Sequence, residues 1–334
     1  MVHALRARLA GVALPPACGG LGLGFIEVGI VAEELGRVVA PGPYLATVTQ
    51  FAAAVVASGS TFGLAGVSGG TLTGAAGRPR VGAGRRRRWR APPCRSGLDA
   101  GWRLVGAKTH VLDGATADEL VVVARGHDGL GLFVVPSASV VATAPAVIDP
   151  TTPLATVVLD DVEVSGDRVL LAPGDPRADD VVARVLDEAT AALCLSTVAT
   201  CRAIFEATVQ YAKDRHQWAP IGSFQAIKHR LADCFLAVER ASSLAYFAAL
   251  TIAEDDPRRP LAVAMAKAAA GDCARLLGRD GLQLHGGIGF TWEHDLHFHL
   301  KRAVTGELLF GSSAFHRVRA AELLGLAPTA EGAA

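Results

Sequence analysis

Residues 215–230 read RHQWAPIGSFQAIKHR, and this stretch joins two long helical patterns. Apolar side chains recur at helical spacing over residues 187–216 before it and over residues 223–256 after it. We expect Ser223 to cap the second helix, which should end before Pro257. Long helices joined by short connections are typical of a helical bundle. This segment therefore predicts that the C-terminal part of the chain is helical.

The rest of the chain divides by the period of its apolar residues. Residues 258–287 and 295–326 continue the helical pattern, so we expect a four-helix bundle over 177–326, followed by a tail at 327–334. Short β-branched runs separated by turn residues predict an antiparallel β-barrel or sandwich over 99–172. Residues 1–67 predict an N-terminal helical domain. The expected fold class is α+β and multidomain.

An arginine-rich stretch separates the N-terminal helical domain from the β-domain. Eight arginines fall within the eighteen residues from Arg78 to Arg95. A solvated linker over 68–98 is one interpretation, and a phosphate-binding segment is another. A third is a local anomaly of the sequence, because its composition resembles nothing around it. The structure of this stretch stays open at this stage.

Composition excludes several classes of function. The 334 residues are 51% hydrophobic and 19% charged, which is typical of a globular chain. Its 32 basic and 32 acidic residues balance, so neither nucleic acid nor an anionic membrane is an expected partner. The six cysteines form no CxxC pair and predict buried free thiols. No secretion signal and no unbroken apolar run of about 20 residues is present, so we expect a cytoplasmic protein without a membrane span.

Two segments carry residues suited to binding a ligand. Arg215 at a helix corner suits a phosphate, and Trp218 suits stacking on a flat ring. The alternative is a salt-bridged arginine beside a core tryptophan. In the second segment, Gly286 and Gly287 allow a backbone to approach a ligand closely. No metal site is expected, because the nearby histidines lack metal-ligand spacing: these are His294, His297 and His299.

These motifs together resemble the acyl-CoA dehydrogenase family. PPACGGLGLGFIEVGIVAEELGR (15–37) is similar to the family's PeeyGGlGlg…aEElGr. YAKDRHQWAPIGSFQAIKHRLAD (211–233) is similar to YakeRxQFGxPIxxfQaixhxlAD. MAKAAAGDCARLLGRDGLQLHGGIGFTWEHDL (265–296) resembles a stretch that ends in Q-x-hGGxGyt-e. The resemblance covers residues 14–326, with an interruption across 68–98.

The resemblance implies a fold, a cofactor and partners. The fold is helical, then β, then helical, and the cofactor is FAD, which the family shares across a dimer interface. An acyl-CoA thioester is the implied substrate, and an electron-transfer protein the implied acceptor. The implied FAD-binding residues are Arg215, Gln217, Trp218, Phe224, Gln225, Gln283, His285, Gly286 and Gly287.

Three departures from the family pattern concern chemistry. The arginine-rich stretch stands where the family has a flavin motif similar to TEPxxGSD. Leu112 stands where the family carries a hydroxyl toward the flavin. The family's catalytic glutamate lies in YEGT, and Gly311 aligns with that glutamate here. The chain also begins later than the family pattern, without its first helix.

The identity of the base is therefore open. Some family members carry the catalytic glutamate near the start of the first bundle helix. Glu188 lies one residue out of register with that position, so it is a candidate base. The alternative is that Glu188 is a residue of the helix's first turn, where the helix dipole favours a carboxylate. Glu307, one turn before Gly311, is a weaker candidate. LLFGSSAFHR (308–317) and WEHDLHFHLKRA (292–303) resemble actinobacterial-type family members that form one half of a two-chain dehydrogenase for bulky or steroid acyl-CoA esters. We therefore predict FAD-dependent α,β-dehydrogenation within a heteromeric enzyme; the alternative is a catalytically silent structural subunit.

Overall fold

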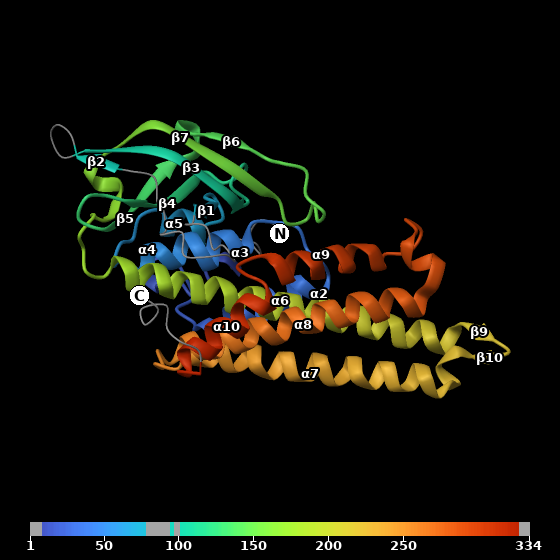
Figure 1. Ribbon diagram of the computed structural model, residues 1–334. Coiled ribbons are helices and arrows are strands. Elements are labelled where there is room, and N and C mark those ends of the chain that lie inside the picture. Colours follow the sequence, from blue (N-terminus) through green and yellow to red (C-terminus); the bar gives the residue numbers. More distant parts are fainter. Residues whose placement is uncertain (1–8, 78–93, 97–100, 327–334) are drawn as a thin grey trace. The chain divides into compact units, whose positions relative to one another are not determined.

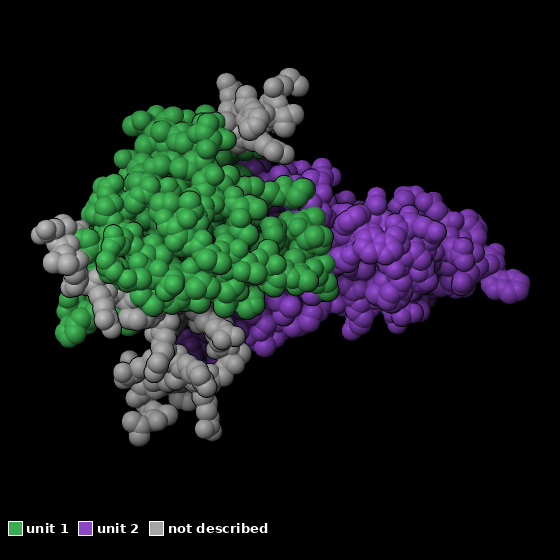
Figure 2. All heavy atoms as spheres, turned by 90° about the horizontal axis from the view of Figure 1, so that it is seen from above, with its two compact units in different colours: residues 1–28, 41–189 green, residues 29–40, 190–334 purple. Residues whose placement is uncertain are grey.

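The computed structural model describes residues 9–77, 94–96 and 101–326 (Figure 1). The chain forms two compact units, coloured separately in Figure 2. Unit 1 comprises residues 1–28 and 41–189, and unit 2 comprises residues 29–40 and 190–334. Helices, β-sheets and a helical bundle follow one another along the chain, which confirms the predicted fold class. The central part of the arginine-rich stretch, residues 78–93, lies outside the described residues.

Unit 1 begins with short helices. The first part of α2 (Phe25–Arg37) belongs to it, as do α3 (Tyr44–Ala46), a π-helical turn (Thr47–Ala52) and α4 (Ala53–Ala57). The last three form one apolar helix, and α5 (Leu64–Ser68) follows. The core of this unit packs Phe51 and Leu64 from the helices against strand residues such as Val121, Leu132 and Val134. Most residues of the apolar segment after Pro43 are buried.

Two four-stranded sheets complete unit 1. The first has the order β1 (Gly74–Gly77), β4 (Glu119–Arg125), β5 (Leu130–Pro136), β8 (Val169–Leu171). The second has the order β2 (Cys94–Ser96), β3 (Trp102–Leu112), β7 (Leu154–Val164), β6 (Val141–Thr143). Trp102 of the second sheet lies 5.7 Å from Phe133 of the first, measured between ring centroids. The sheets therefore pack face to face as a sandwich.

One strand pair departs from the antiparallel expectation. β1 pairs with β4 in parallel, from Gly74 opposite Glu119 to Gly77 opposite Val122, whereas the other pairs in both sheets are antiparallel. β1 falls within the segment that the sequence assigned to a linker. Its four residues are glycine and alanine, which carry no β-branched signal, and all four are buried. The composition of β1 therefore gives no sequence signal for a strand, although the strand forms and is buried.

Unit 2 is built on three long helices, the first of which contributes its residues from 190 onward. They are α6 (Ala178–Asp214), α7 (Gln225–Ala253) and α8 (Arg259–His285). The 3₁₀ turn η6 (Gly286–Phe290), α9 (Leu296–Leu308) and α10 (Ser313–Leu323) follow. α8 packs against α7, α9 and α10 (Figure 1).

Small residues allow close packing in this bundle. A Cβ built on Gly306 of α9 would lie 2.2 Å from Thr197 Oγ1 of α6, so only glycine fits there.

Burial raises the pKa of the Cys194 thiol to about 12. The prediction of buried free thiols is confirmed for the five cysteines with described side chains, which are Cys18, Cys194, Cys201, Cys234 and Cys273.

The predicted cap of α7 is wrong. Ser223 lies in a 3₁₀ turn (Ile221–Ser223), and the helix begins at Gln225 with Phe224 as its N-cap. The backbone carbonyl of Ile221 accepts the amide of Phe224 at 3.2 Å, so the turn occupies the position that the cap would have taken. The Ser223 hydroxyl makes no capping hydrogen bond to α7.

Candidate functional site

The corner between α6 and α7 presents a tryptophan to solvent. β9 (His216–Gln217) and β10 (Ala219–Pro220) form a hairpin around Trp218, and Figure 1 shows this hairpin at the tip where the two helices meet. Trp218 has φ +67° and its side chain is fully exposed. A bulky residue seldom adopts positive φ. The ring is therefore held away from any core, and the alternative of a core tryptophan is wrong.

Arg215 begins this corner. Its backbone carbonyl accepts the amide of Ile221 at 2.8 Å, which closes the loop. Its exposed guanidinium has no ion pair or hydrogen bond among the residues that the structure describes. The Phe224 side chain is 44% exposed. The side-chain amide nitrogen of Gln225, Nε2, lies 3.1 Å from His229 Nε2. The corner therefore offers an unengaged cation and two exposed aromatic rings.

The C-terminal end of α8 lies at the same end of the bundle. The ring of His285 stacks on Tyr211 of α6, with centroids 4.5 Å apart. Arg230 of α7 lies 3.7 Å from Asp280 of α8. The end of α6 and the end of α8, some 70 residues apart in the sequence, therefore lie together in the bundle.

His285 supports this region from inside. Its Nδ1 lies 2.8 Å from the carbonyl oxygen of Gly281, so Nδ1 carries the proton and donates it. Burial lowers the pKa of His285, and its Nε2 is buried without a partner among the described residues. A neutral ring with a bare acceptor nitrogen does not attract a phosphate oxygen. The imidazole is therefore better suited to hold the backbone than to bind an anion.

The glycine pair after α8 is open to solvent. Gly286 has φ +65°, and a Cβ on Gly286 or Gly287 would meet no described atom within 4 Å. Gln283, one turn earlier, is also exposed. Exposed glycine backbone, an unengaged arginine and a free indole at the same end of a bundle can bind a phosphate and an adjoining flat ring. These residue types fit a dinucleotide such as FAD.

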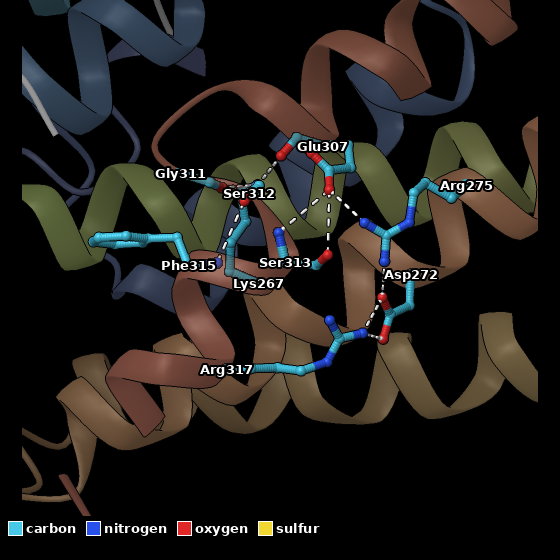
Figure 3. Close-up of polar contacts among 9 residues, drawn as sticks. All are labelled: Lys267, Asp272, Arg275, Glu307, Gly311, Ser312, Ser313, Phe315 and Arg317. Atoms are coloured by element: carbon cyan, nitrogen blue, oxygen red, sulfur yellow. Dashed lines mark hydrogen bonds and ion pairs between the residues drawn. The ribbon is translucent and has the colours of Figure 1, made fainter. Parts of the chain in front are cut away.

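A second polar cluster lies at the turn between α9 and α10 (Figure 3). The Lys267 side chain is fully buried, and its Nζ donates to the carbonyl oxygens of Glu307 and Gly311, each at 2.8 Å. Burial lowers the pKa of Lys267. The Glu307 carboxylate accepts from Arg275 at 2.9 Å and from the Ser313 amide at 3.3 Å. Two side chains of α8 therefore bind this region: Lys267 binds two backbone carbonyls, and Arg275 binds the carboxylate of Glu307.

The turn itself has an unusual backbone. Phe310 has φ +65° and Gly311 has φ +104°. A Cβ on Gly311 would lie 2.7 Å from Phe315 Cδ1 and 3.0 Å from His316 Nε2. Nε2 of His316 donates to the carbonyl of Phe310 at 2.9 Å. A side chain at position 311 is therefore excluded by both conformation and space.

Glu188 lies inside α6 and not in its first turn. The helix begins at Ala178, about three turns earlier, so the interpretation of Glu188 as a first-turn residue is wrong. Its carboxylate accepts from Arg184 at 2.9 Å, and the side chain is 15% exposed. Glu188 is thus an ion-paired carboxylate of unit 1.

Comparison with known proteins identifies the family. Residues 3–61 match the N-terminal domain of acyl-CoA dehydrogenases, and residues 180–325 match their C-terminal domain. Acyl-CoA dehydrogenase IpdE2 of Mycobacterium tuberculosis is 31% identical over 88% of this chain and 76% of its own length. The chain belongs to the acyl-CoA dehydrogenase family.

Solved structures agree with this assignment. The ChsE4-ChsE5 complex from Mycobacterium tuberculosis matches with a TM-score of 0.85 and 26% identity, covering 97% of this chain and 86% of that one. A steroid ACAD variant matches with a TM-score of 0.84 and 29% identity, covering 98% and 87%. Acyl-CoA dehydrogenases are flavin oxidoreductases that use FAD to dehydrogenate acyl-CoA esters. The predicted family, enzyme class and cofactor are confirmed.

The departures from the acyl-CoA dehydrogenase pattern can now be placed. Leu112 is 3% exposed at the end of β3, so an apolar side chain is buried there. His110 has φ +57° at a register shift of β3 against β7. The stretch that stands in place of the TEPxxGSD motif lies mostly outside the described residues.

The histidines after α8 have other partners. The ring of His297 meets Trp292 edge-on at 4.5 Å, and His299 Nε2 lies 3.2 Å from the carbonyl of Arg37. His294 Nδ1 accepts the amide of Leu296 at 3.1 Å. Within the described part of the chain, no group of three or more His, Cys, Asp or Glu could hold a metal ion.

Two helices, α6 and α7, are long and apolar enough to cross a membrane. Their most apolar stretches are 67% and 39% buried within the protein. Each stretch contains charged residues, so the sequence shows no unbroken apolar run there. Core helices of bundles have the same length and composition, so these two helices are weak evidence for a membrane span.

Sequence reasoning missed the cluster around Lys267. The available signal was a single lysine in the apolar run AVAMAKAAA of residues 262–270. A charge on the buried side of a helix needs partners. Those partners, the carbonyls of Glu307 and Gly311, lie 40 and 44 residues further along the chain, which no local pattern could indicate.

Burial of His316 makes the stability of the fold depend on pH. Burial lowers its pKa from 6.5 to about 4, so between these values the unfolded chain binds a proton that the folded chain does not. The free energy of unfolding should therefore fall as the pH drops from 6.5 to 4, by up to about 3 kcal/mol. His316→Gln can still donate to the Phe310 carbonyl but does not titrate. Urea unfolding at pH 7 and 4.5 should show a smaller loss for His316→Gln; equal losses would contradict this assignment.

Proposed function

We propose that this chain is one subunit of a heteromeric FAD-dependent enzyme that dehydrogenates an acyl-CoA thioester between Cα and Cβ. The family and its chemistry are established above, and the heteromeric assembly is the proposal. It rests on one observation: the α9–α10 turn carries no carboxylate and has no room for a side chain at Gly311. A subunit without its own base at this turn needs one from elsewhere.

The turn geometry suggests a one-residue change of register. Because Gly311 has φ +104° and its Cβ position is blocked, it suits the glycine of the family's YEGT motif better than the glutamate. Ser312 then matches the threonine, and Phe310 stands in the place of the base. Both registers lead to the same conclusion, which is that no carboxylate is present at this position.

The reaction sets a strict demand on the base. A carboxylate must come within about 3 Å of the α-proton, and its pKa is usually raised by burial. When bound, FAD accepts the β-hydride. Glu188 is paired with Arg184, and Glu307 accepts from Arg275 and Ser313. Each of these carboxylates is therefore already engaged by an arginine of this chain.

We propose that the end of the bundle described above binds FAD. Arg215 would bind a phosphate oxygen, and Trp218 and Phe224 would cover flat rings. The backbone of Gly286 and Gly287 would approach the pyrophosphate, with Gln217, Gln225 and Gln283 as amide donors and His285 as support beneath. These exposed groups suit a cofactor shared with a neighbouring subunit, because the described part of the chain leaves them uncovered.

A partner subunit is also favoured by exposed apolar side chains. Phe235 and Leu236 of α7 are 47% and 65% exposed, and Trp292 is 77% exposed. Exposed aromatic and aliphatic side chains commonly mark interfaces. The structural neighbours include a two-component complex and a steroid ACAD, which supports a related partner and a bulky acyl group. We further propose an electron-transfer protein as acceptor and a cytoplasmic location.

A specific alternative is a catalytically silent subunit. The engagement of Glu188 and Glu307 by arginines is the observation that favours it. Purification of the chain alone and after co-expression with a candidate partner distinguishes the two. Stoichiometric FAD with acyl-CoA-dependent bleaching only in the complex supports the heteromeric enzyme. A complex whose activity and flavin reside wholly in the partner supports the silent subunit.

Arg215→Ala should reduce FAD retention. Loss of a charged phosphate partner typically costs about 1.5–3 kcal/mol, which is about 10- to 100-fold in affinity. The flavin-to-protein ratio after gel filtration measures this loss. Arg240→Ala, an exposed arginine of α7 away from the corner, is a suitable control. Unchanged flavin content in Arg215→Ala would remove the phosphate-binding role.

A further inference from the structure

The turn between α9 and α10 holds two consecutive residues in left-handed backbone conformations. Gly311 tolerates this, but Phe310 does not do so without cost, because its Cβ crowds the backbone at φ +65°. Such conformations persist only where surrounding contacts determine them. The carbonyl of Phe310 is bound by His316, and the carbonyl of Gly311 is bound by Lys267. The contacts that fix this turn are therefore identifiable.

Lys267 closes the C-terminal end of α9. The carbonyl of Glu307 is one of the last in that helix, where backbone carbonyls lack intrahelical partners. An ammonium group is favoured there by the helix dipole. The same Nζ reaches past the helix end to the carbonyl of Gly311 at 2.8 Å. One buried cation thus binds the helix end and the turn together (Figure 3).

Glu307 secures the other side of the turn. One oxygen, Oε1, accepts from the Ser313 amide at 3.3 Å and from the Ser313 hydroxyl at 3.2 Å. Ser313 is the first residue of α10, where a carboxylate is favoured by the helix dipole. Arg275 of α8 donates to the same oxygen at 2.9 Å. The negative charge therefore stands at the start of α10, as the positive charge stands at the end of α9.

We propose that Lys267 and Glu307 are positioning residues that hold the α9–α10 turn so that Phe310 stays where most family members carry the catalytic base. This inference rests on the proposed function, because it takes the turn to border the acyl-CoA site. The turn of this chain would then contribute a fixed aromatic wall in place of a carboxylate. Its position would determine how tightly a thioester binds.

The same network supplies a matched control. Arg317 of α10 binds both carboxylate oxygens of Asp272, and Arg275 donates to Asp272 as well. Among the described residues Arg317 makes no hydrogen bond or ion pair with residues 309–312, although its ion pair with Asp272 belongs to the same cluster (Figure 3). A purely stabilising network would make Arg317 and Glu307 equivalent. A positioning role for Glu307 makes them differ.

The experiment compares variants of the FAD-loaded chain, with its partner subunit if it co-purifies. Dissociation constants for butyryl-CoA, octanoyl-CoA and cyclohexanecarbonyl-CoA are measured from the change in flavin absorbance. Lys267→Met and Glu307→Leu should weaken the tightest thioester about tenfold, because small displacements in a site have large effects. Glu307→Gln, which keeps an oxygen acceptor for Ser313, should stay within about twofold of wild type, as should Arg317→Gln.

Several results would overturn the proposal. They are equal effects of Glu307→Gln and Glu307→Leu, an effect of Arg317→Gln as large as that of Glu307→Leu, and unchanged binding in folded Lys267→Met. If Lys267→Met does not fold, Ser313→Ala takes its place, with an expected loss of about threefold from one hydrogen bond; no loss contradicts the proposal.

A separate readout distinguishes this proposal from the proposed function. If wild-type protein binds neither FAD nor any thioester, the proposed function fails. The turn is then tested by hydrogen exchange of its amides, including Gly311, whose amide lies 3.4 Å from the Leu308 carbonyl. Exchange at the turn should be about tenfold faster in Lys267→Met than in Arg317→Gln. Equal rates would show that Lys267 does not hold the turn.

Discussion

In the isolated chain, an acyl-CoA should reduce the bound flavin at least about 100-fold more slowly than in the chain assembled with its partner subunit. A missing general base typically costs 10²–10⁴-fold in rate, hence the lower bound of about 100-fold. The described turn offers Phe310 and Gly311 where the family has glutamate, and neither can take a proton. Stopped-flow bleaching of the flavin absorbance, with and without the partner, measures the ratio.

Glu188→Gln distinguishes the possible sources of the base. The substitution is nearly isosteric, so the fold should be retained. We expect the rate of the assembled enzyme to stay within about twofold, because Glu188 is engaged by Arg184. Arg184→Gln is the matched control, since it removes the same ion pair but keeps the carboxylate. Robust activity of the isolated chain that disappears in Glu188→Gln, but survives in Arg184→Gln, would assign the base to Glu188.

The long helices were predictable because their apolar periodicity extends over many turns. The segment RHQWAPIGSFQAIKHR locates the α6–α7 corner because proline and glycine interrupt that periodicity at one place. The short strand β1 was not predictable, because its sequence GAAG lacks β-branched residues. Its burial depends on neighbouring Phe51, whose ring would lie 2.1 Å from a Cβ on Gly74. Tertiary packing decides such a strand, and local propensity does not.

The α6–α7 corner was more accessible to sequence reasoning than the α9–α10 turn. Arg215 and Trp218 belong to one short motif, and their exposure follows from a local hairpin. Lys267, Glu307 and Ser313 come from three helices and meet only in the folded bundle. The left-handed backbone of Phe310 has no sequence signal either, since phenylalanine is not a residue that favours it. Distance along the chain and backbone strain therefore limited the prediction.

Gly311→Ala should lower the free energy of unfolding by about 3 kcal/mol. One part is backbone strain, because an L-residue with a left-handed backbone costs about 1–2 kcal/mol. The other part is overpacking, which typically costs about 1–3 kcal/mol. The new Cβ would lie 2.7 Å from Phe315 Cδ1. Gly311→Glu should be at least as destabilising, so inserting a carboxylate at this position should not restore a base.

Gly325→Ala separates the two parts of this effect. Gly325 also has a left-handed backbone, at φ +69°, but no described atom lies within 4 Å of its Cβ position. This control should lose only about 1 kcal/mol. The double variant Gly311→Ala with Phe315→Ala should be less destabilised than the two single losses added together, because Phe315→Ala removes the ring that clashes. Urea unfolding of the wild type, the three single variants and the double variant measures these losses. Additive losses, or equal losses in Gly311→Ala and Gly325→Ala, would show that the turn has room for a side chain. The change of register that places Phe310 at the position of the family's base, which rests on the blocked Cβ position of Gly311, would then be lost.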